Sequence, residues 1–446
     1  TQTYTSTPPE MPRYPVIGNM FNLREPFKFL MEVARTGDVV RFQMPLWKPY
    51  FLSHPDHIEH VLRVNHLNYN KDTLHFVFLI FGQGLASSDG ELWKRQRRMA
   101  QPMFRHDSVK MFGQIMTDAA EELCERLKSF ADTGTPVRLD RYMRELTLTV
   151  VARSLFGLDI EPYMPEVHRI VGTASEFLSA RVVNPFVPSS MPTPLNLRLK
   201  SAMSDFRRLV DRIIAERRRQ GGDHNDLLSM LIDARDEAGN GMDDHQLQDE
   251  VITLIVAGFD TTAAGLTWSF YLLSKYPEAA HRLREELDGA LGGSVPTIDD
   301  LPRIPFPRMV FQEALRLYPP IWIIARRAIG EDRLGNYSVP AGTEVAMSPW
   351  VMHHHPQYWE NPEGFNPDRF TPEQVKARPE FAYLPFGGGP RTCIGNHFAV
   401  LEGQLAMSVI AQRYRLHLVP GHPYGTETGI PLRFLKGTLV TVHSAS

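Results

Sequence analysis

Apolar residues recur every three to four positions over most of the chain, which is the period of an amphipathic α-helix. The pattern is clear in six stretches bounded by proline and glycine: residues 111–130, 142–156, 204–219, 249–276, 277–291 and 307–318. The alternation typical of β-strands is confined to short pieces: residues 39–43 with 50–53, 344–347, 415–418 and 439–442. The pattern therefore predicts a mainly α-helical fold with small β-sheets.

No linker and no internal repeat divides the chain, so we predict one domain over residues 1–446 that starts with a proline-rich segment, 1–19. Length alone would favour about three domains. The longest apolar candidate lies around residues 251–259, short of the roughly 18 residues that a membrane span requires. We therefore expect the chain as given to be soluble and cytoplasmic, while its proline-rich start leaves open an anchor before residue 1.

Charge and cysteine content narrow the classes of protein. The chain has 48 Lys plus Arg against 51 Asp plus Glu, a net charge of -3, so no long-range attraction to nucleic acid is expected. Its two cysteines, Cys124 and Cys393, lie far apart in sequence and indicate no disulfide framework. Cys124 falls in a helical pattern, where we expect a core residue.

Cys393 lies in a different setting, the glycine-rich stretch 386–395 with the sequence FGGGPRTCIG, just before a helical pattern. Glycines let the backbone approach a flat ligand closely, and a nearby helix N-terminus favours a thiolate. We therefore expect an anionic and shielded sulfur. With only His397 within a turn, the thiolate cannot complete a tetrahedral zinc site locally, but it suffices as the axial ligand of a haem iron. A buried structural cysteine in a tight turn is the alternative.

The same stretch resembles the haem loop of the cytochrome P450 family, F-x-x-G-x-R-x-C-x-G. All five fixed positions are matched, by Phe386, Gly389, Arg391, Cys393 and Gly395. The resemblance implies a cytochrome P450-like fold with a single haem domain. It also implies haem b, iron protoporphyrin IX, as the cofactor and Cys393 as the axial ligand of its iron.

Residues 257–262, with the sequence AGFDTT, resemble the family's oxygen-activation signature. Gly258 permits a local widening of the helix, and the Thr261 hydroxyl can turn to a local carbonyl or outward to a ligand. The resemblance implies that Thr261 relays protons for O–O cleavage and that Asp260 supplies them. The alternative is that Thr261 and Thr262 bond back within a core helix and that Asp260 is solvated.

A third motif is the pair Glu313 and Arg316, three residues apart on one predicted helix. Such a pair is by itself most often a surface ion pair. Its place before Arg369 and Cys393 follows the family's order of motifs. The resemblance then implies that Glu313, Arg316 and Arg369 form a buried charge network.

The two carboxylates of a haem require cationic or hydrogen-bonding partners when they are buried. Trp93, Arg97, Arg327 and Arg391 match family positions for this role. Arg326, which precedes Arg327, leaves that assignment ambiguous by one residue.

Apolar residues fill the four windows in which the family makes substrate contacts, and they predict a pocket for a lipophilic small molecule. Each of them could equally belong to the core. They are Phe76, Phe78, Phe81, Phe177, Val256, Ala257, Ile321 and Ile324.

The resemblance implies a haem-thiolate monooxygenase that inserts one oxygen atom from O2 into a C–H or C=C bond of a lipophilic small molecule. No flavin or iron–sulfur module is recognisable, so electrons must come from separate proteins or from a fused part absent from this sequence. We expect a separate donor, either a ferredoxin with its reductase or a flavoprotein reductase, and a monomer. Lys94, Arg95 and Arg98 form either a solvated basic face or a docking site for an acidic donor. Two alternatives stay open: a peroxide-driven or rearranging haem-thiolate enzyme, and a non-enzymatic haem-binding sensor. The pair Asp260 and Thr261 favours oxygen activation.

Overall fold

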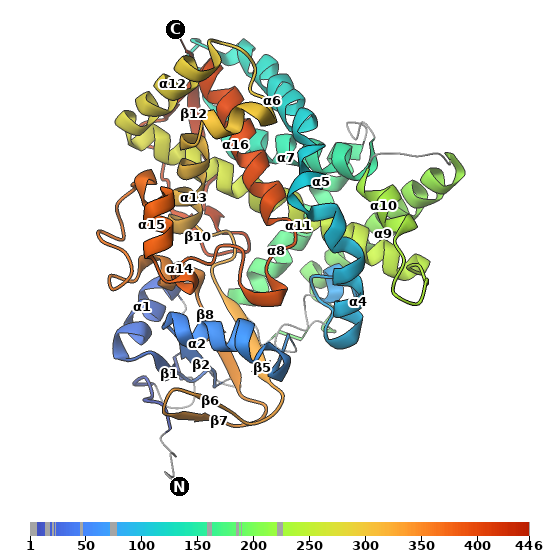
Figure 1. The fold of residues 1–446 in the computed structure, drawn as a ribbon, viewed down its shortest axis with the longest axis vertical. Helices are drawn as coiled ribbons and strands as arrows, with labels where there is room; N and C mark the ends of the chain where they lie inside the picture. The colour runs from blue at the N-terminus through green and yellow to red at the C-terminus, as the bar shows by residue number, and fades with distance from the viewer. Residues whose placement is uncertain are drawn as a thin grey trace. The chain divides into compact units, whose positions relative to one another are not determined.

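The computed structural model describes residues 7–13, 18–19, 22, 24–44, 48–71, 78–157, 163–183, 187–188, 190–220 and 226–445, with only the backbone at 164, 182, 183 and 220. The chain forms two compact units, each made of separate stretches (Figure 1). The first unit comprises Thr1–His75, Arg316–Gly364 and Arg369–Cys393, and the second comprises Phe76–Leu315, Phe365–Asp368 and Ile394–Ser446. Because the stretches interleave, neither unit is a continuous half of the chain, and the single domain stays a prediction.

The first unit is built around a five-stranded sheet with the strand order β1-β2-β8-β5-β3. Strands β2 and β8 run parallel, and β5 runs antiparallel to β8 with Ile324 opposite Met347 and Arg327 opposite Glu344. The elements of this unit are α1 Pro26–Thr36, β1 Val39–Arg41, β2 Tyr50–Leu52, α2 Pro55–Glu59, β3 Tyr69–Asn70, β5 Ile324–Ala328, β6 Asp332–Leu334, β7 Tyr337–Val339, β8 Glu344–Met347, α14 Pro349–His354 and α15 Pro372–Ala377.

One apolar cluster connects this sheet with the segment that leads to Cys393. Its members share almost complete burial, so their removal from water favours one arrangement of sheet and segment. They include Val39, Leu52, Ile58, Leu62, Tyr69, Val345, Met347, Met352, Phe381 and Leu384.

The second unit is mainly helical, and its central helix is α11, Asp244–Lys275. Asp243 caps this helix by accepting the Gln246 N–H at 2.8 Å, and Pro277 begins the next helix after Tyr276. Helix α11 packs on α7, Leu139–Phe156, on α9, Pro194–Gln220, and on α16, Asn396–Arg413.

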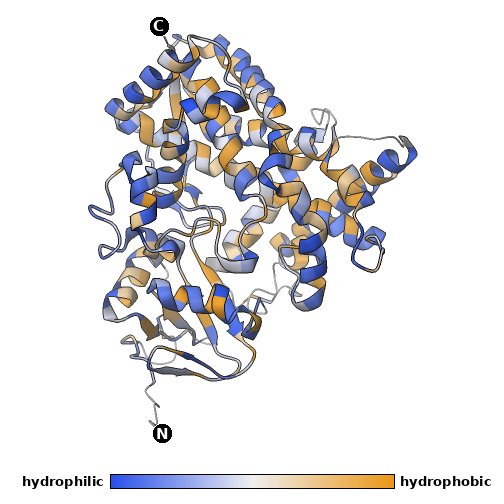
Figure 2. Cartoon of the chain, viewed as in Figure 1, coloured by the Kyte–Doolittle hydropathy of each residue, from blue (hydrophilic) through white to orange (hydrophobic). Residues whose placement is uncertain are grey.

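The remaining elements of the second unit surround these helices. Both apolar and polar residues are spread along most of its helices, as expected where one side of each helix is buried (Figure 2). The elements are α3 Phe78–Phe81, α4 Gly90–Ala100, α5 His106–Lys110, α6 Gly113–Leu127, β4 Val137–Arg138, α8 Met164–Val183, α10 Leu227–Asp233, α12 Pro277–Leu291, α13 Phe306–Leu317, β9 Tyr414–Leu418, β10 Thr426–Glu427, β11 Arg433–Phe434 and β12 Leu439–Ser444.

These elements confirm the predicted fold class and most of the predicted segments, including the strand 344–347, and α11 begins five residues earlier than predicted. Among the described residues, α11 is also the one helix long and apolar enough to cross a membrane by length and composition. Of the most apolar 18-residue stretch of α11, 67% is buried inside the protein. The core helix of a globular protein has the same property.

Candidate functional site

The turn that carries Cys393 is closed by its own backbone. The Phe386 carbonyl accepts the Cys393 N–H at 2.9 Å and the Thr392 hydroxyl at 3.3 Å, and Thr392 N–H donates to the Gly389 carbonyl at 3.0 Å. Gly389 has a φ of +66°, and a Cβ at this position would lie 1.9 Å from the Leu62 carbonyl oxygen. Only glycine fits there, because both the backbone angle and the space exclude a side chain.

The sulfur of Cys393 is exposed, so the predicted shielding by protein atoms is wrong. Helix α16 begins at Asn396, three residues later, so the predicted helix N-terminus beside the thiol is confirmed. Among the described residues, no three His, Cys, Asp or Glu side chains gather to hold a metal ion.

Gly395 provides a test of whether the turn suits a flat cofactor. Its φ is -89°, which any residue can adopt, and no protein atom lies within 4 Å of the place where a Cβ would be. Neither backbone strain nor packing therefore explains a glycine at this position. An exposed thiol beside a bare stretch of backbone would suit a flat cofactor whose metal takes one thiolate ligand.

Cys124, by contrast, is completely buried in α6, as predicted. Burial raises the pKa of its thiol to about 12, which keeps the thiol neutral. Its surroundings are those of an inert core residue.

The arginines proposed for the haem carboxylates have different surroundings. Arg391 and Phe386 are partly buried in the Cys393 turn. Arg327 pairs with Glu344 on the neighbouring strand, so its charge already has a partner. Strand residues alternate in direction, which puts Arg326 on the same face of β5 as Ile324. Ile324 lies toward the Cys393 turn, since its Cδ1 is 3.9 Å from the Cβ position of Gly387.

In the second unit, Trp93 and Arg97 are four residues apart on α4, and Trp93 is buried while Arg97 is partly buried. Lys94, Arg95 and Arg98 on the same helix do not form an unpaired basic face. They bind Glu91, Asp236 and Glu237 respectively. Arg95 also donates to Gln246 and to the Gly241 carbonyl, at 2.7 Å each, so it holds α4 to the segment before α11.

The middle of α11 has one accessible strip on an otherwise buried helix. The strip consists of Leu254, Ala257, Gly258 and Thr261, which recur with the helical period, and Ala257 is exposed. Thr261 donates its hydroxyl to the Ala257 carbonyl at 2.8 Å, which is the local bond that the sequence left as an alternative. The helix is α-helical throughout, so the widening that Gly258 permits is not present. Gly258 instead allows close packing, because a Cβ there would lie 3.2 Å from Val151.

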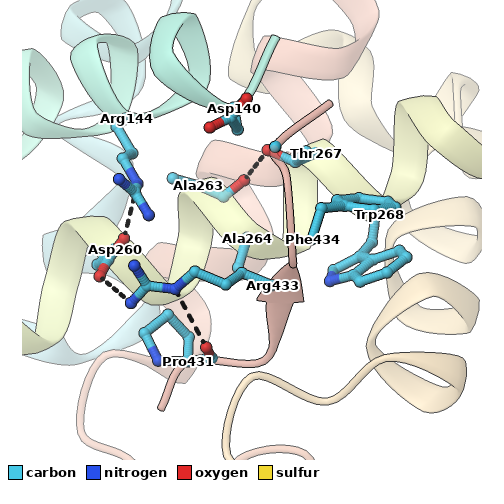
Figure 3. A pocket seen from close by; sticks show the side chains of 11 residues that line it. Asp140, Arg144, Asp260, Ala263, Ala264, Thr267, Trp268, Pro431, Arg433 and Phe434 are labelled. Atoms are coloured by element: carbon cyan, nitrogen blue, oxygen red, sulfur yellow. Dashed lines mark hydrogen bonds and ion pairs between the residues drawn. The ribbon is translucent and has the colours of Figure 1, made fainter. Parts of the chain in front are cut away.

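Asp260 points away from solvent and is 5% exposed, so the alternative of a solvated carboxylate is wrong. Its Oδ1 lies 3.1 Å from Arg144 Nε of α7, and its Oδ2 lies 3.3 Å from Arg433 Nη2 of β11 (Figure 3). Ser175 of α8 donates its hydroxyl to Oδ2 at 2.9 Å. Two cations and a hydroxyl thus compensate for the burial of this carboxylate.

A small cavity of about 30 Å³ adjoins Asp260, and its lining includes Asp140, Arg144, Thr267 and Arg433. This volume and these polar groups suit one bound water molecule. Sequence reasoning missed Arg144, Ser175 and Arg433, because no local pattern connects residues so distant in sequence with Asp260.

Glu313 and Arg316 are completely buried, so the alternative of a surface ion pair is wrong. Arg316 donates to the carbonyl oxygens of His353 at 2.8 Å, Pro362 at 2.7 Å and Gly364 at 2.9 Å. The Glu313 carboxylate accepts the Asn366 N–H at 2.9 Å. The proline-rich stretch 361–370 is therefore held largely through its backbone.

Arg369, the third member of the predicted network, donates to the Asn361 carbonyl at 2.9 Å. Its guanidinium thus contacts the same stretch from within. All three residues contact this stretch, and their support of the haem stays a prediction.

The residues predicted to line the substrate pocket differ in exposure. Phe76 lies outside the described residues. Phe78 is 38% exposed, Ala257 is exposed, and Ile321 and Ile324 are partly buried. Three others are buried: Phe81, Phe177 and Val256. Phe177 is completely buried beneath the Arg181 guanidinium, 4.7 Å from its ring centre, and is placed as a core residue would be.

Comparison with known proteins gives the same assignment along nearly the whole chain. The family model for cytochrome P450 matches residues 8–435. Cyclooctat-9-en-7-ol 5-monooxygenase of Streptomyces melanosporofaciens is 35% identical over 433 residues, which are 94% of each chain. Pentalenene oxygenase of Streptomyces avermitilis is 31% identical over 410 residues, 91% of this chain and 90% of the relative.

The crystal structure of the cytochrome P450DA haem domain superposes with a TM-score of 0.88. The superposition covers 99% of this chain and 98% of the P450DA chain at 24% sequence identity, which establishes the same fold. Both the predicted fold and the predicted activity class are thereby confirmed. The chain belongs to the cytochrome P450 family and is a haem-thiolate monooxygenase.

Proposed function

We propose that this monooxygenase oxidises a cyclic terpene, with haem b as its cofactor. Similarity to two terpene oxygenases over more than nine-tenths of the chain supports this substrate class. Their names specify cyclooctat-9-en-7-ol and pentalenene as the molecules that they oxidise. A pocket wall formed by the predicted apolar residues would suit such a substrate, because it would remove hydrocarbon from water without requiring charged partners.

Cys393 is the proposed iron ligand. A thiolate ligand must come from a cysteine, and the chain has only two. Cys124 has a buried thiol with a raised pKa, whereas Cys393 has an exposed sulfur on a turn that excludes side chains. When bound, the haem supplies an iron whose thiolate ligand favours O–O cleavage and oxygen insertion.

The cofactor's carboxylates would be bound by Arg391, Trp93 and Arg97. Arg326 is a better candidate than Arg327 for the fourth position. Arg327 already has Glu344 as its partner, while Arg326 shares a strand face with Ile324.

Asp260 and Thr261 are proposed to deliver protons. The hydroxyl that Thr261 donates to Ala257 leaves its oxygen free to accept a further hydrogen bond. Asp260 can exchange protons with a water molecule in the adjoining cavity. Proton delivery of this kind suits O2-dependent turnover and disfavours a peroxide-driven or rearranging reaction.

Electrons would come from a separate ferredoxin with its reductase, or from a flavoprotein reductase, and the enzyme would act as a cytoplasmic monomer. Lys94 and Arg95 are poor candidates for docking the donor, because they already bind Glu91 and Asp236.

Binding measurements can test the substrate class. The ferric enzyme would be titrated with a sesquiterpene olefin, a polycyclic diterpene alcohol, a fatty acid, a steroid and a macrolide, and the spin-state spectrum recorded. We expect the terpenes to bind most tightly and to yield products that carry one atom from labelled O2. Tighter binding of a fatty acid or a macrolide would contradict the proposal.

Variants can test the pocket wall at the same time. Ile324→Ala should weaken terpene binding, whereas Val375→Ala, at a position 46% exposed, is the matched control and should not. Peroxide supplied without reductant should support less turnover than O2 with a donor system. Equal turnover under both conditions would favour the peroxide-driven alternative.

A further inference from the structure

His353, the penultimate residue of α14, is completely buried and connects two segments of the first unit. Its Nδ1 lies 3.1 Å from the Arg316 carbonyl oxygen, and its Nε2 accepts the Leu384 N–H at 2.9 Å. The His353 carbonyl in turn accepts Arg316 Nη1 at 2.8 Å. One residue thus contacts both the buried arginine and the start of the Cys393 segment.

The partners of the ring define its protonation. A backbone N–H can only donate, so Nε2 must be the unprotonated nitrogen that accepts from Leu384. A carbonyl can only accept, so Nδ1 carries the hydrogen and donates to Arg316. The ring is therefore neutral. Complete burial and the charge on Arg316 both lower the pKa of His353, which is consistent with this state.

The orientation of the ring is restricted by packing as well. Its centre lies 5.1 Å from the ring of Tyr383 and 6.4 Å from that of Trp359. The Arg316 guanidinium lies over the same Trp359 ring at 5.0 Å. Rotation of the imidazole would have to displace these side chains. Packing and the two hydrogen bonds therefore favour the same orientation of the ring.

Two backbone hydrogen bonds, from overlapping turns, lie between Leu384 and the backbone of Cys393. The Leu384 carbonyl accepts the Gly387 N–H at 3.1 Å, which closes a tight turn. The next bond joins the Phe386 carbonyl to the Cys393 N–H at 2.9 Å. Leu384 is thus the first residue of the hydrogen-bonded structure that presents Cys393.

We propose that His353 is a positioning residue that anchors the Cys393 turn to Arg316 and so keeps the thiolate in place for the cofactor. The inference rests on the proposed role of Cys393 as the iron ligand. It adds a function for a buried histidine that belongs to none of the sequence motifs. Without its acceptor, the Leu384 N–H would be buried and unsatisfied, and the turn would be free to shift.

Two amide substitutions separate the contacts of the ring. In His353→Gln the side-chain amide can reach the position of Nε2 and accept from Leu384. In His353→Asn the shorter amide reaches only the position of Nδ1 and can donate to Arg316. His354→Gln is the matched control, because His354 is also buried but bonds to Trp350 of its own helix at 2.8 Å.

The measured quantity is the ratio of thiolate-type to thiol-type Soret bands in the reduced carbon monoxide complex. Loss of one buried hydrogen bond should lower this ratio about fivefold in His353→Asn. His353→Gln should restore the wild-type ratio, and His354→Gln should keep it despite a lower melting temperature. A wild-type ratio in His353→Asn would overturn the proposal, as would an equal loss in His354→Gln.

Amide hydrogen exchange tests the same bond without any substitution and independently of Cys393. In the haem-loaded wild-type protein, the Leu384 amide should exchange as slowly as the amides of α14, although it lies outside any helix or strand. Rapid exchange at Leu384 would overturn the proposal about His353. If Leu384 is protected but Cys393→His keeps a thiolate spectrum, the assignment of the iron ligand fails instead.

Discussion

The turn that carries Cys393 is held mainly by its own backbone, whereas the Asp260 carboxylate is held by side chains from three other elements. In the turn, the hydrogen bonds join residues no more than seven positions apart, and glycine provides the space. Around Asp260, the partners Arg144, Ser175 and Arg433 come from α7, α8 and β11.

This difference follows from what each site has to hold. A thiol ligand needs an exposed sulfur and a precise backbone, which a short glycine-rich stretch can provide. A buried carboxylate needs compensating charge. Only residues one turn away on the same helix could reach it, so most of its partners must come from other elements. The first kind of site is therefore visible as a local motif, and the second is not.

The largest expected effect concerns the two cysteines. Cys393→His should abolish the strongly red-shifted Soret band of the reduced carbon monoxide complex, because no other accessible thiolate exists among the described residues. Cys124→Ser should keep the band and only lower the melting temperature, since Cys124 is a core residue. A thiolate spectrum in Cys393→His would show that the local motif was misread.

The next effect tests the charged site. Asp260→Asn keeps the shape of the side chain but removes its exchangeable proton, so turnover with O2 and reductant should fall about 100-fold. The carbon monoxide spectrum should stay unchanged, and peroxide-driven turnover should fall much less. An equal loss in both reactions would mean that Asp260 acts through structure rather than through protons.

Glu250 is a second buried acid on the same helix as Asp260, but no cation in the described part of the chain pairs with it as Arg144 and Arg433 pair with Asp260. Its Oε1 has no hydrogen-bond partner among the described residues, and burial raises its pKa to about 7 from an ordinary 4.5. A raised carboxyl pKa means that ionisation is more costly in the folded protein than in the unfolded chain. The free energy of unfolding should therefore fall as pH rises from about 4.5 through about 7, by up to roughly 3 kcal/mol.

Chemical denaturation at pH 5 and pH 8 can measure this effect. Glu250→Gln cannot ionise, so it should be more stable than the wild type at pH 8 and similar to it at pH 5. The same difference at both pH values would contradict the assigned pKa.

The smallest effect separates the cations around Asp260. Arg433→Met leaves Arg144 and Ser175 in place, so it should destabilise the fold by about 1–2 kcal/mol. Asp260→Asn should lower the free energy of unfolding less in this variant than in the wild-type protein, because Arg433 and Asp260 interact with each other. Lys436→Met, at an exposed position two residues after the hairpin strand β11, is the control. Strict additivity would show that Arg433 and Asp260 are not coupled.

Much of the fold was predictable from periodicity, because helix formation depends on a pattern that is local. The strand 344–347 was predicted with its observed bounds, and α12 was predicted over Pro277–Leu291. Helix α8 was not predicted from periodicity, and neither was strand β5. The pattern of β5 alternates weakly, since two adjacent arginines interrupt it.

The two arginines of β5 show how a shift of one position in the sequence changes which residue is assigned to a haem carboxylate. Sequence resemblance could not distinguish Arg326 from Arg327. Strand direction and the pairing of Arg327 with Glu344 favour Arg326. Successive strand residues face opposite sides of the sheet, so a shift of one position decides which arginine shares the face of Ile324.

The sequence alone determined the family, the mainly helical fold, the cysteine turn and the order of the motifs, because each depends on residues close together in the chain. Only the tertiary structure decided what surrounds Asp260, how Arg316 reaches His353, and that Arg327 of β5 pairs with Glu344. Those contacts join residues separated by tens to hundreds of positions, and they arise where buried charges and N–H groups must find partners. Local patterns carry no information about such pairings, because folding alone brings the partners together.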